Sequence, residues 1–174
     1  MPRGIIIFGK NGCGKSTIGK ELARKLNYKY MDIENYHFVE SEIPYTIERT
    51  QDECKNLMIK DIKKYENFVI SAVTGDFGDE ITSMYELGVF ITAPFEIRIN
   101  RIKERSIKKF GSRVVEGGDM YEANNKFIDF VKGRDYKKLE EWSNSLECPI
   151  IYIDGTKDIK ENIDLIIGKY LKIN

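Results

Sequence analysis

The sequence has few of the residues that build metal centres and disulfide frameworks. Its 174 residues include three cysteines and one histidine. Cys13, Cys54 and Cys148 lie far apart and form no C-x-x-C pair, so neither a Cys/His zinc site nor a set of disulfides is expected. Unpaired cysteines are typical of a reducing compartment, which predicts a cytoplasmic protein.

Long hydrophobic runs and an excess of one charge are also absent. The N-terminal apolar run covers only Ile5 to Phe8, whereas a signal peptide core needs about 7 residues and a membrane span roughly 20. The 28 basic residues balance 28 acidic residues, for a formal net charge of zero. This balance excludes a global basic field, so neither nucleic acid nor a membrane is expected as a partner. We further expect a monomer or a weak dimer.

Five short apolar segments predict the strands of a parallel sheet, because each is followed by a segment of helical periodicity. These segments are Ile5–Phe8, Tyr28–Ile33, Phe68–Val73, Gly88–Thr92 and Pro149–Ile153. The alternation predicts right-handed crossovers and an α/β/α fold of three layers. No repeat or Pro/Ser-rich linker interrupts the pattern, and the length suits one domain over residues 1–174.

Two segments outside the strands are expected to move or to bind. Apolar positions recur with helical spacing over Thr46–Tyr65, which predicts a helix inside a broader acceptor-binding region at about residues 35–66. Between Ser106 and Asp119 the periodicity fails and three glycines appear, which predicts a lid loop at about residues 106–118.

A phosphate-binding loop follows the first predicted strand. Residues 9–16 fit G-x-x-x-x-G-K-[ST] in full, between a strand and a helix as that motif requires. Backbone amides and the helix N-terminus supply positive potential, Lys15 reaches the outer phosphates, and Ser16 can ligate Mg²⁺. The predicted ATP contacts in this loop are Gly9, Lys10, Asn11, Gly12, Cys13, Gly14, Lys15, Ser16 and Thr17.

An acidic pair follows the second predicted strand. No strand ends in the hhhhDE pattern of motor and transporter ATPases, and the acids nearest the phosphate loop are Asp32 and Glu34. Strand alternation predicts both carboxylates on one face, where Asp32 would hold Mg²⁺ through water and Glu34 would contact an acceptor hydroxyl. The alternative is a pair of solvated loop acids.

Basic residues concentrate between Arg98 and Arg113. Helical spacing puts Arg98, Arg101 and Arg105 on one face, where converging guanidinium groups can neutralise a transferring phosphoryl group. The alternative for any one of them is a solvated helix face.

With these motifs the chain resembles the nucleoside-monophosphate kinase and shikimate kinase group, whose archetype is adenylate kinase. Four stretches carry the resemblance: the phosphate loop, Asp32-Ile33-Glu34, Arg101 to Arg105, and Asp154 to Lys157. It implies a sheet ordered 2-3-1-4-5 and the cofactors ATP and Mg²⁺. It also implies that adenine stacks on Arg101 and rests on the backbone around Thr156 and Lys157.

The same resemblance implies three catalytic arginines. Arg105 matches the second arginine of an R-x-x-x-R pair that works on the phosphates, Arg113 is the lid's phosphate contact, and Arg134 reaches the reaction centre. Together with Lys15 and Asp32 these are the expected catalytic residues. Glu34 replaces the second acid of the D-x-D pair of shikimate kinases.

The acceptor is less well defined because the segment after the third strand departs from both family patterns. Val73 to Gly78 has neither the Asp-Gly-Phe-Pro-Arg of adenylate kinases nor the glycine triplet of shikimate kinases. Glu34, Arg49, Gly75 and Asp76 are the candidate acceptor contacts, and aromatic residues such as Tyr45 could stack on a base or a sugar.

The sequence therefore predicts an ATP-dependent kinase for a small acceptor, with a nucleotide or nucleoside preferred. Two alternatives stay open. One is a kinase for a non-nucleotide metabolite or an antibiotic hydroxyl, and the other is an ATP-binding regulatory protein that is not a kinase.

Overall fold

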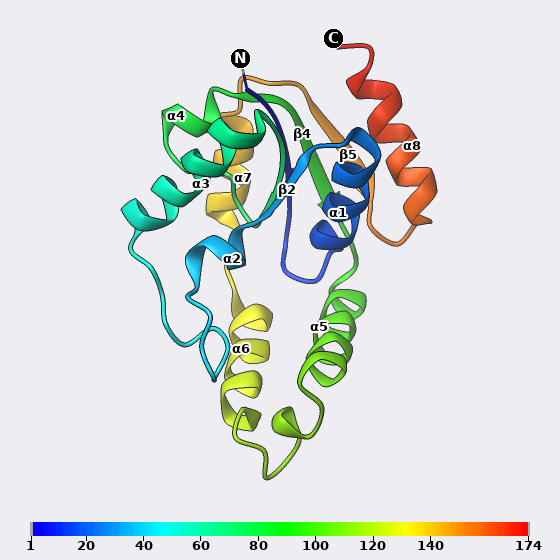
Figure 1. The fold of residues 1–174 in the computed structure, drawn as a ribbon. Helices are drawn as coiled ribbons and strands as arrows, with labels where there is room; N and C mark the ends of the chain where they lie inside the picture. The colour runs from blue at the N-terminus through cyan, green and yellow to red at the C-terminus, as the bar shows by residue number, and fades with distance from the viewer. Residues whose placement is uncertain (1, 174) are drawn as a thin grey trace.

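In the computed structural model, which describes residues 2–173, the five predicted strands form a single parallel sheet (Figure 1). The strands are β1 (Arg3–Phe8), β2 (Lys29–Asp32), β3 (Asn67–Ala72), β4 (Tyr85–Thr92) and β5 (Ile150–Asp154). Their order is β2-β3-β1-β4-β5, and every neighbouring pair is parallel. The predicted order 2-3-1-4-5 is confirmed.

The central strand explains why two helical layers are needed. Side chains of a strand point alternately to the two faces of a sheet, and residues Ile5 to Phe8 have no exposed surface at all. Ile5 and Ile7 pack into one apolar cluster with α1 (Lys15–Leu26) and α8 (Ile159–Tyr170). Ile6 and Phe8 pack into a second cluster with α3 (Gln51–Tyr65) and α7 (Lys137–Asn144). The predicted three-layer α/β/α fold is confirmed.

A helical hairpin extends beyond the carboxyl ends of the strands (Figure 1). It consists of α5 (Phe95–Phe110), a 3₁₀ turn (Gly111–Val114) and α6 (Tyr121–Gly133). A small cluster of buried residues joins the two long helices; it comprises Ile99, Ile102, Ile128 and Val131. The hairpin therefore has its own core and stands next to the phosphate loop. Two short helices, α2 (Ile33–His37) and α4 (Asp79–Thr82), complete the fold.

The predicted boundaries of two segments were wrong. Helix α3 begins at Gln51 rather than Thr46, because Thr50 and Glu53 form a capping box with reciprocal hydrogen bonds. The predicted lid loop is partly helical, since α5 continues through Ser106 to Phe110 and ends where Gly111 adopts a φ of 56°.

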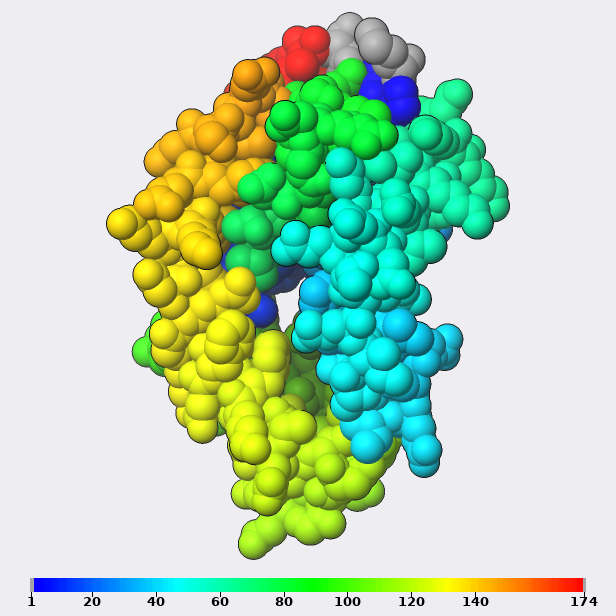
Figure 2. All heavy atoms as spheres, turned by 90° about the vertical axis from the view of Figure 1, so that its left-hand side faces the viewer, coloured from blue at the N-terminus to red at the C-terminus, as the bar shows by residue number. Residues whose placement is uncertain are grey.

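The segment between α2 and α3 folds back on itself and reaches the hairpin. Phe38 and Glu48 form an isolated antiparallel bridge, and Val39 N–H donates to Ile47 O at 2.8 Å. At the tip of this segment Tyr45 lies against Lys109 and Phe110 of α5. Figure 2 shows the resulting opening, which is bounded by this segment and by α6.

Within residues 2–173 no helix is both long enough and apolar enough to cross a membrane.

Candidate active site

The phosphate loop joins the end of β1 to the start of α1. Gly9, Gly12 and Gly14 have φ angles of 146°, 80° and 110°, a region that favours glycine. Packing also requires glycine at position 12, because a Cβ atom there would lie 2.4 Å from the carbonyl oxygen of Arg98. The first helical residue is Lys15, so free amides of α1 face the concave side of this loop.

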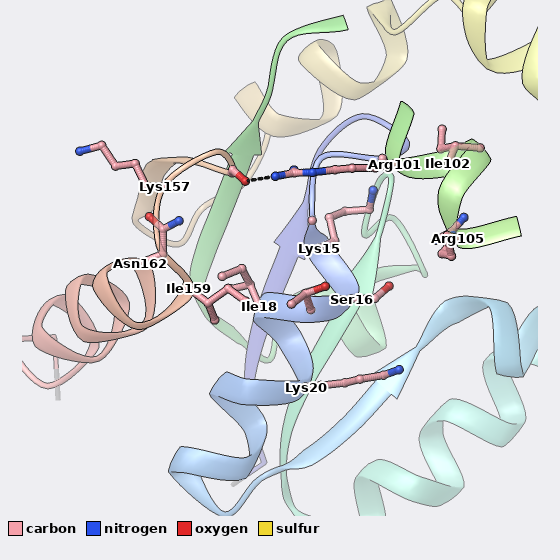
Figure 3. Close-up of a pocket in the computed structure, with 14 residues that line it drawn as sticks. Lys15, Ser16, Ile18, Lys20, Arg101, Ile102, Arg105, Lys157, Ile159 and Asn162 are labelled. Carbon is pink, nitrogen blue, oxygen red and sulfur yellow. Dashed lines mark hydrogen bonds between the residues drawn. The ribbon is translucent and has the colours of Figure 1, made fainter. Parts of the chain in front are cut away.

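A cavity of about 490 Å³ opens at this loop (Figure 3). The charged side chains in its lining are all cationic, namely Lys15, Lys20, Arg101, Arg105 and Lys157. The remaining lining residues are Gly12, Gly14, Ser16, Thr17, Ile18, Ile102, Gly155, Ile159 and Asn162. A polyanion with an apolar ring suits this cavity, because cations surround one part and isoleucine side chains another.

Lys15 is held in place by atoms of its own loop. Its Nζ donates to the carbonyl oxygen of Lys10 at 3.0 Å and lies 3.9 Å from Sγ of Cys13. Burial lowers the pKa of Lys15, and the nearby Arg105 lowers it further, whereas Cys13 and the carboxylates Glu34 and Asp32 raise it. A bound phosphate would relieve both unfavourable contributions, because it supplies negative charge next to a buried ammonium group.

Ser16 and Asp32 provide the oxygen atoms that a magnesium ion requires. Ser16 Oγ donates to Asp32 Oδ2 at 3.2 Å, and the same oxygen accepts the Tyr30 hydroxyl at 3.1 Å. Oδ1 of Asp32 accepts the backbone N–H of Glu34. Hydroxyl and carboxylate oxygens suit Mg²⁺, which completes its shell with water and phosphate oxygens. Residues 2–173 contain no group of three or more His, Cys, Asp or Glu side chains arranged for a metal.

The structural reason for pairing Asp32 with Glu34 was wrong. The strand ends at Asp32, which caps α2, so Glu34 lies in the first turn of a helix rather than on a strand face. Both carboxylates still act on the pKa of Lys15, which places the two of them beside the phosphate loop.

The three arginines of α5 do not share one solvent-facing surface. Arg98 is buried, and its Nη1 donates to the carbonyl oxygen of Asn11 at 3.1 Å. Arg101 spans the cavity edge, with Nη2 donating to Gly155 O at 2.9 Å and Nη1 to Cys13 O at 3.4 Å (Figure 3). Arg105 lines the cavity with its side chain exposed. Arg98 therefore supports the loop, and the other two arginines face the ligand space.

The loop after β5 forms the opposite edge of the cavity. Asp154 Oδ1 accepts the backbone N–H and the hydroxyl of Thr156 at 2.8 and 2.7 Å, and these hydrogen bonds lower the pKa of Asp154. Asn162 donates to the carbonyl oxygen of Asp154 at 2.8 Å. Lys157 reaches the cavity lining, whereas Thr156 is engaged in the turn. Among the cavity residues that the sequence pattern missed are two polar ones, Lys20 and Asn162, which belong to no motif and are found only from the packing.

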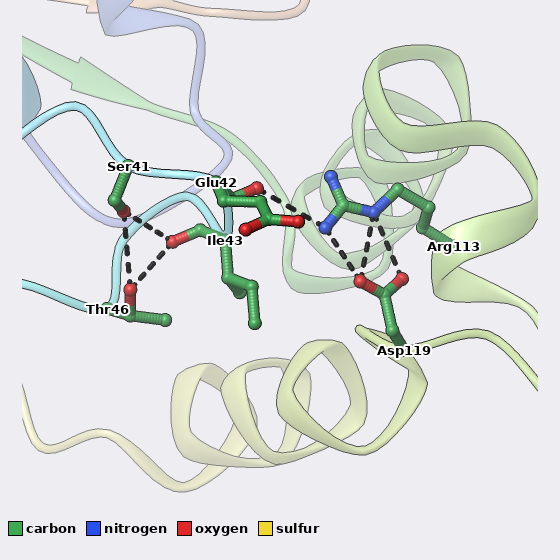
Figure 4. Close-up of polar contacts among 6 residues, drawn as sticks. All are labelled: Ser41, Glu42, Ile43, Thr46, Arg113 and Asp119. Carbon is green, nitrogen blue, oxygen red and sulfur yellow. Dashed lines mark hydrogen bonds and ion pairs between the residues drawn. The ribbon is translucent and has the colours of Figure 1, made fainter.

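Arg113 and Arg134 occupy different surroundings. Arg113 pairs with Asp119 at 2.7 Å, and its Nη2 also contacts the carbonyl oxygen of Glu42 (Figure 4). It does not line the nucleotide cavity. Arg134 lies against the phosphate loop, where Nη1 donates to Asn11 Oδ1 at 3.0 Å.

The remaining candidate acceptor residues are not brought to the phosphate loop. Arg49 donates through Nη1 to three backbone carbonyl oxygens, those of Asn35, Tyr36 and Phe38. Gly75 is buried and accepts the Tyr85 hydroxyl at 2.9 Å. Asp76 lines a second cavity of about 730 Å³ with Tyr85 and Pro149, at the amino ends of β4 and β5. That cavity lies at the opposite edge of the sheet from the phosphate loop, because the strands are parallel.

Comparisons with known proteins agree with this arrangement. A family model described as an AAA domain matches residues 5–120. An uncharacterized protein, YqaC, of Bacillus subtilis is 29% identical over the full length of both chains. A shikimate kinase of Clostridium botulinum is 32% identical, over 67% of this chain and 78% of its own length.

The fold of a solved relative is similar as well. The crystal structure of shikimate kinase from Bacteroides thetaiotaomicron superposes with a TM-score of 0.59 at 19% identity, over 97% of this chain and 98% of that one. These similarities agree with the phosphate loop, the order of the sheet and the acid after β2. The chain therefore belongs to the P-loop family of this AAA-domain model and is a member of the small-molecule kinase group that includes nucleoside-monophosphate kinases and shikimate kinases.

Proposed function

We propose that this protein transfers the γ-phosphoryl group of ATP to a hydroxyl group of a small acceptor. The acceptor oxygen forms a bond to the γ-phosphorus, the bond from that phosphorus to the β,γ-bridging oxygen breaks, and ADP leaves. The hydroxyl proton passes to a carboxylate and then to solvent. The observation that carries the proposal is the hydrogen bond from Ser16 to Asp32. It puts a carboxylate next to the phosphate loop, whose cavity is lined by cations.

Each charged group has a separate task in this mechanism. Lys15 and the loop amides hold the phosphates, and Ser16 and Asp32 would hold Mg²⁺, with water between Asp32 and the ion. When bound, Mg²⁺ would neutralise phosphate charge. Arg105 and Arg134 stabilise the transferring group because fixed cations need no reorganisation as charge shifts. Glu34 orients the acceptor hydroxyl and takes up its proton.

We propose that Arg113 joins the site only when the hairpin closes. In the present conformation its guanidinium is held by Asp119, so a phosphate contact requires a rearrangement of residues 106–118, the lid of the mechanism. Closure would also exclude water, which otherwise competes with the acceptor for the γ-phosphoryl group.

The acceptor that this site fits best is a hydroxylated metabolite of sugar or sugar-acid size. Arg49, the basic residue expected to read an acceptor phosphate or carboxylate, is engaged by three carbonyl oxygens of the α2 end. This occupancy argues against Arg49 as the contact for an acceptor anion, either a phosphate or a carboxylate. A nucleotide acceptor, whose own phosphate needs a cationic contact, is therefore less favoured. The similarity to shikimate kinases points to the same class.

A nucleoside is the second candidate, and the aromatic residues of the acceptor region favour it. Phe38 and Tyr45 lie 5.3 Å apart between ring centroids, and Tyr45 contacts Phe110. Phe38 and Tyr45 belong to the segment that bounds the opening toward the hairpin, and a base could stack on such rings.

A panel assay tests the proposal. Purified protein is incubated with Mg²⁺ and ATP and with three panels of acceptors: sugars, sugar acids and cyclic polyols; nucleosides; and nucleoside monophosphates. We expect ADP release that depends on a member of the first panel, with a phosphorylated product of matching mass. Turnover confined to nucleoside monophosphates would overturn the acceptor class but keep the kinase activity.

The Lys15→Ala variant is the control in the same assay. Since Lys15 holds the phosphates, the acceptor-dependent signal should disappear in this variant. Tight ATP binding by the wild-type protein without turnover of any panel member would favour the regulatory alternative.

A further inference from the structure

We infer that Asn11 and Tyr136 are positioning residues that hold Arg134 at the reaction centre through an uncharged acceptor, the Oδ1 atom of Asn11. The inference rests on the proposed function, in which Arg134 contacts the transferring phosphoryl group. The loop motif predicts neither residue for this role. Its pattern leaves position 11 unspecified, and Tyr136 lies outside the motif.

One amide oxygen connects the phosphate loop to the end of α6. Oδ1 of Asn11 accepts Nη1 of Arg134 at 3.0 Å and the hydroxyl of Tyr136 at 3.1 Å. A carbonyl-type oxygen has two lone pairs, so these two donors satisfy it completely. The main chain of Asn11 is held as well, because its own carbonyl oxygen accepts Nη1 of buried Arg98 at 3.1 Å. Asn11 is therefore fixed at both its backbone and its side chain.

Cations and an aromatic ring, rather than a carboxylate, surround the guanidinium of Arg134. Three cations approach its buried ring: Nζ of Lys10 at 5.0 Å, Cζ of Arg134 at 5.4 Å and Cζ of Arg98 at 5.8 Å from the centroid. The ion pairs found among residues 2–173 include none of these three side chains. The aromatic face and the Asn11 oxygens offset their mutual repulsion without neutralising them.

This arrangement suits a cation that must act on phosphate. A carboxylate partner would orient Arg134 equally well but would cancel its charge beside the transferring group. An amide oxygen restricts the guanidinium and leaves a whole positive charge for the phosphates. Phe130, whose ring lies 5.3 Å from Cζ of Arg134, limits the side chain from the α6 side.

The test measures contacts to the third phosphate without requiring an acceptor. Calorimetry gives the dissociation constants of Mg²⁺–ADP and of Mg²⁺–AMP-PNP, a non-hydrolysable ATP analogue. The ratio of the ADP constant to the AMP-PNP constant reports the interactions of the γ-phosphate, and it falls when such interactions are lost. The variants are Asn11→Ala, Arg134→Ala and the double variant, with Tyr136→Phe as a milder change that keeps the ring. Lys132→Ala is the matched control, since this exposed α6 residue pairs only with Asp129 among the contacts described.

We expect Arg134→Ala to lower the ratio about tenfold, in line with one charge-assisted contact of about 1.4 kcal/mol or more. Asn11→Ala should lower it about three- to tenfold, with ADP affinity changed less than about twofold. In the Arg134→Ala background the Asn11 substitution should have no further effect, because it acts through that arginine. Tyr136→Phe should fall between wild type and Asn11→Ala, and Lys132→Ala should match the wild type.

The possible failures are distinguishable. An unchanged ratio in Arg134→Ala would remove Arg134 from the proposed mechanism and the inference with it. A lower ratio in Arg134→Ala with an unchanged ratio in both Asn11→Ala and Tyr136→Phe would overturn the inference alone. An equal loss of ADP and AMP-PNP affinity in Asn11→Ala, or additivity with Arg134→Ala, would make Asn11 a structural residue of the loop. Should Asn11→Ala fail to fold, Tyr136→Phe decides between these outcomes.

Discussion

Ser16 at the start of α1 and Asp32 at the end of β2 share a hydrogen bond of 3.2 Å between Oγ and Oδ2. This contact joins the phosphate loop to the only acid that lies within hydrogen-bond distance of a described side chain of that loop. Mg²⁺ is expected to raise the affinity of the wild-type protein for AMP-PNP. We predict that this increase is smaller by about tenfold or more in Asp32→Asn, because a neutral amide attracts magnesium-bound water weakly. Titrations with and without Mg²⁺ measure this gain.

Tyr30→Phe is the matched control for Asp32→Asn. It removes the other side-chain hydrogen bond to Asp32 Oδ2 but leaves the carboxylate in place. We expect the magnesium effect to stay within about twofold of wild type, since the metal-ordering charge is intact. A magnesium effect that survives in Asp32→Asn would contradict the assigned role of Asp32.

The lid arginine is held by an ion pair that should be easy to break. Arg113 and Asp119 are 36% and 51% exposed, and exposed pairs contribute little to stability. We predict that Asp119→Ala changes AMP-PNP affinity less than about fivefold, whereas Arg113→Ala weakens it about tenfold. Equal affinities for the wild type and Arg113→Ala would show that the lid arginine stays with Asp119 when nucleotide binds.

At Gly19, inside α1, the helix preference favours alanine but the packing against β3 favours glycine. Gly19 is buried, and a Cβ atom there would lie 2.3 Å from Oγ of Ser71 on β3. Alanine favours a helix by about 1 kcal/mol over glycine, but overpacking costs about 1–3 kcal/mol. We therefore predict that Gly19→Ala lowers the free energy of unfolding, measured by urea denaturation, by up to about 2 kcal/mol.

Gly168 in α8 provides the opposite case. No atom lies within 4 Å of the position of its added Cβ, so only the helix preference acts. Gly168→Ala should raise the free energy of unfolding by about 0.5–1 kcal/mol. If both substitutions stabilised the protein, the close approach of α1 to β3 would be wrong.

The start of α3 gives a prediction that separates the two boundaries considered above. With Thr50 as the N-cap, Thr50→Ala should lower the free energy of unfolding by about 1 kcal/mol. With a helix beginning at Thr46, Thr50 would be an interior residue, where alanine is the better helix former. Urea denaturation distinguishes these signs, and nucleotide affinity should not change in either case.

The strands and the phosphate loop were predictable because their signals are local. A run such as Ile5 to Phe8 is short, rich in β-branched residues and bounded by Gly9, which favours a buried strand, and the loop motif follows it directly. The start of α3 was missed although its signal was also local. Ile47 fits the apolar period, but the T-x-x-E pattern of Thr50 and Glu53 marks the N-terminus three residues later.

The surroundings of the charged residues could not be predicted in the same way. Whether Arg49 faces a ligand or the carbonyl oxygens of α2 depends on how residues 38–50 fold back, which no motif describes. The contact of Arg134 with Asn11 likewise joins segments far apart in the chain. Helical spacing put Arg98 and Arg101 on one face, but packing under the loop buries Arg98 and leaves Arg101 at the cavity.

The position of β1 at the centre of the sheet has a consequence for synthesis on the ribosome. The phosphate loop precedes its packing partners in the chain, because β1 pairs with β3 and β4, and Gly12 packs beneath Arg98 of α5. The apolar run of β1 therefore has no strand to pair with until β3 has been made, and its second neighbour β4 follows later still. Such late pairing slows folding and exposes the run to association. The nucleotide-binding loop, although made before α5, would acquire its binding shape only after Arg98 of that helix packs against Gly12.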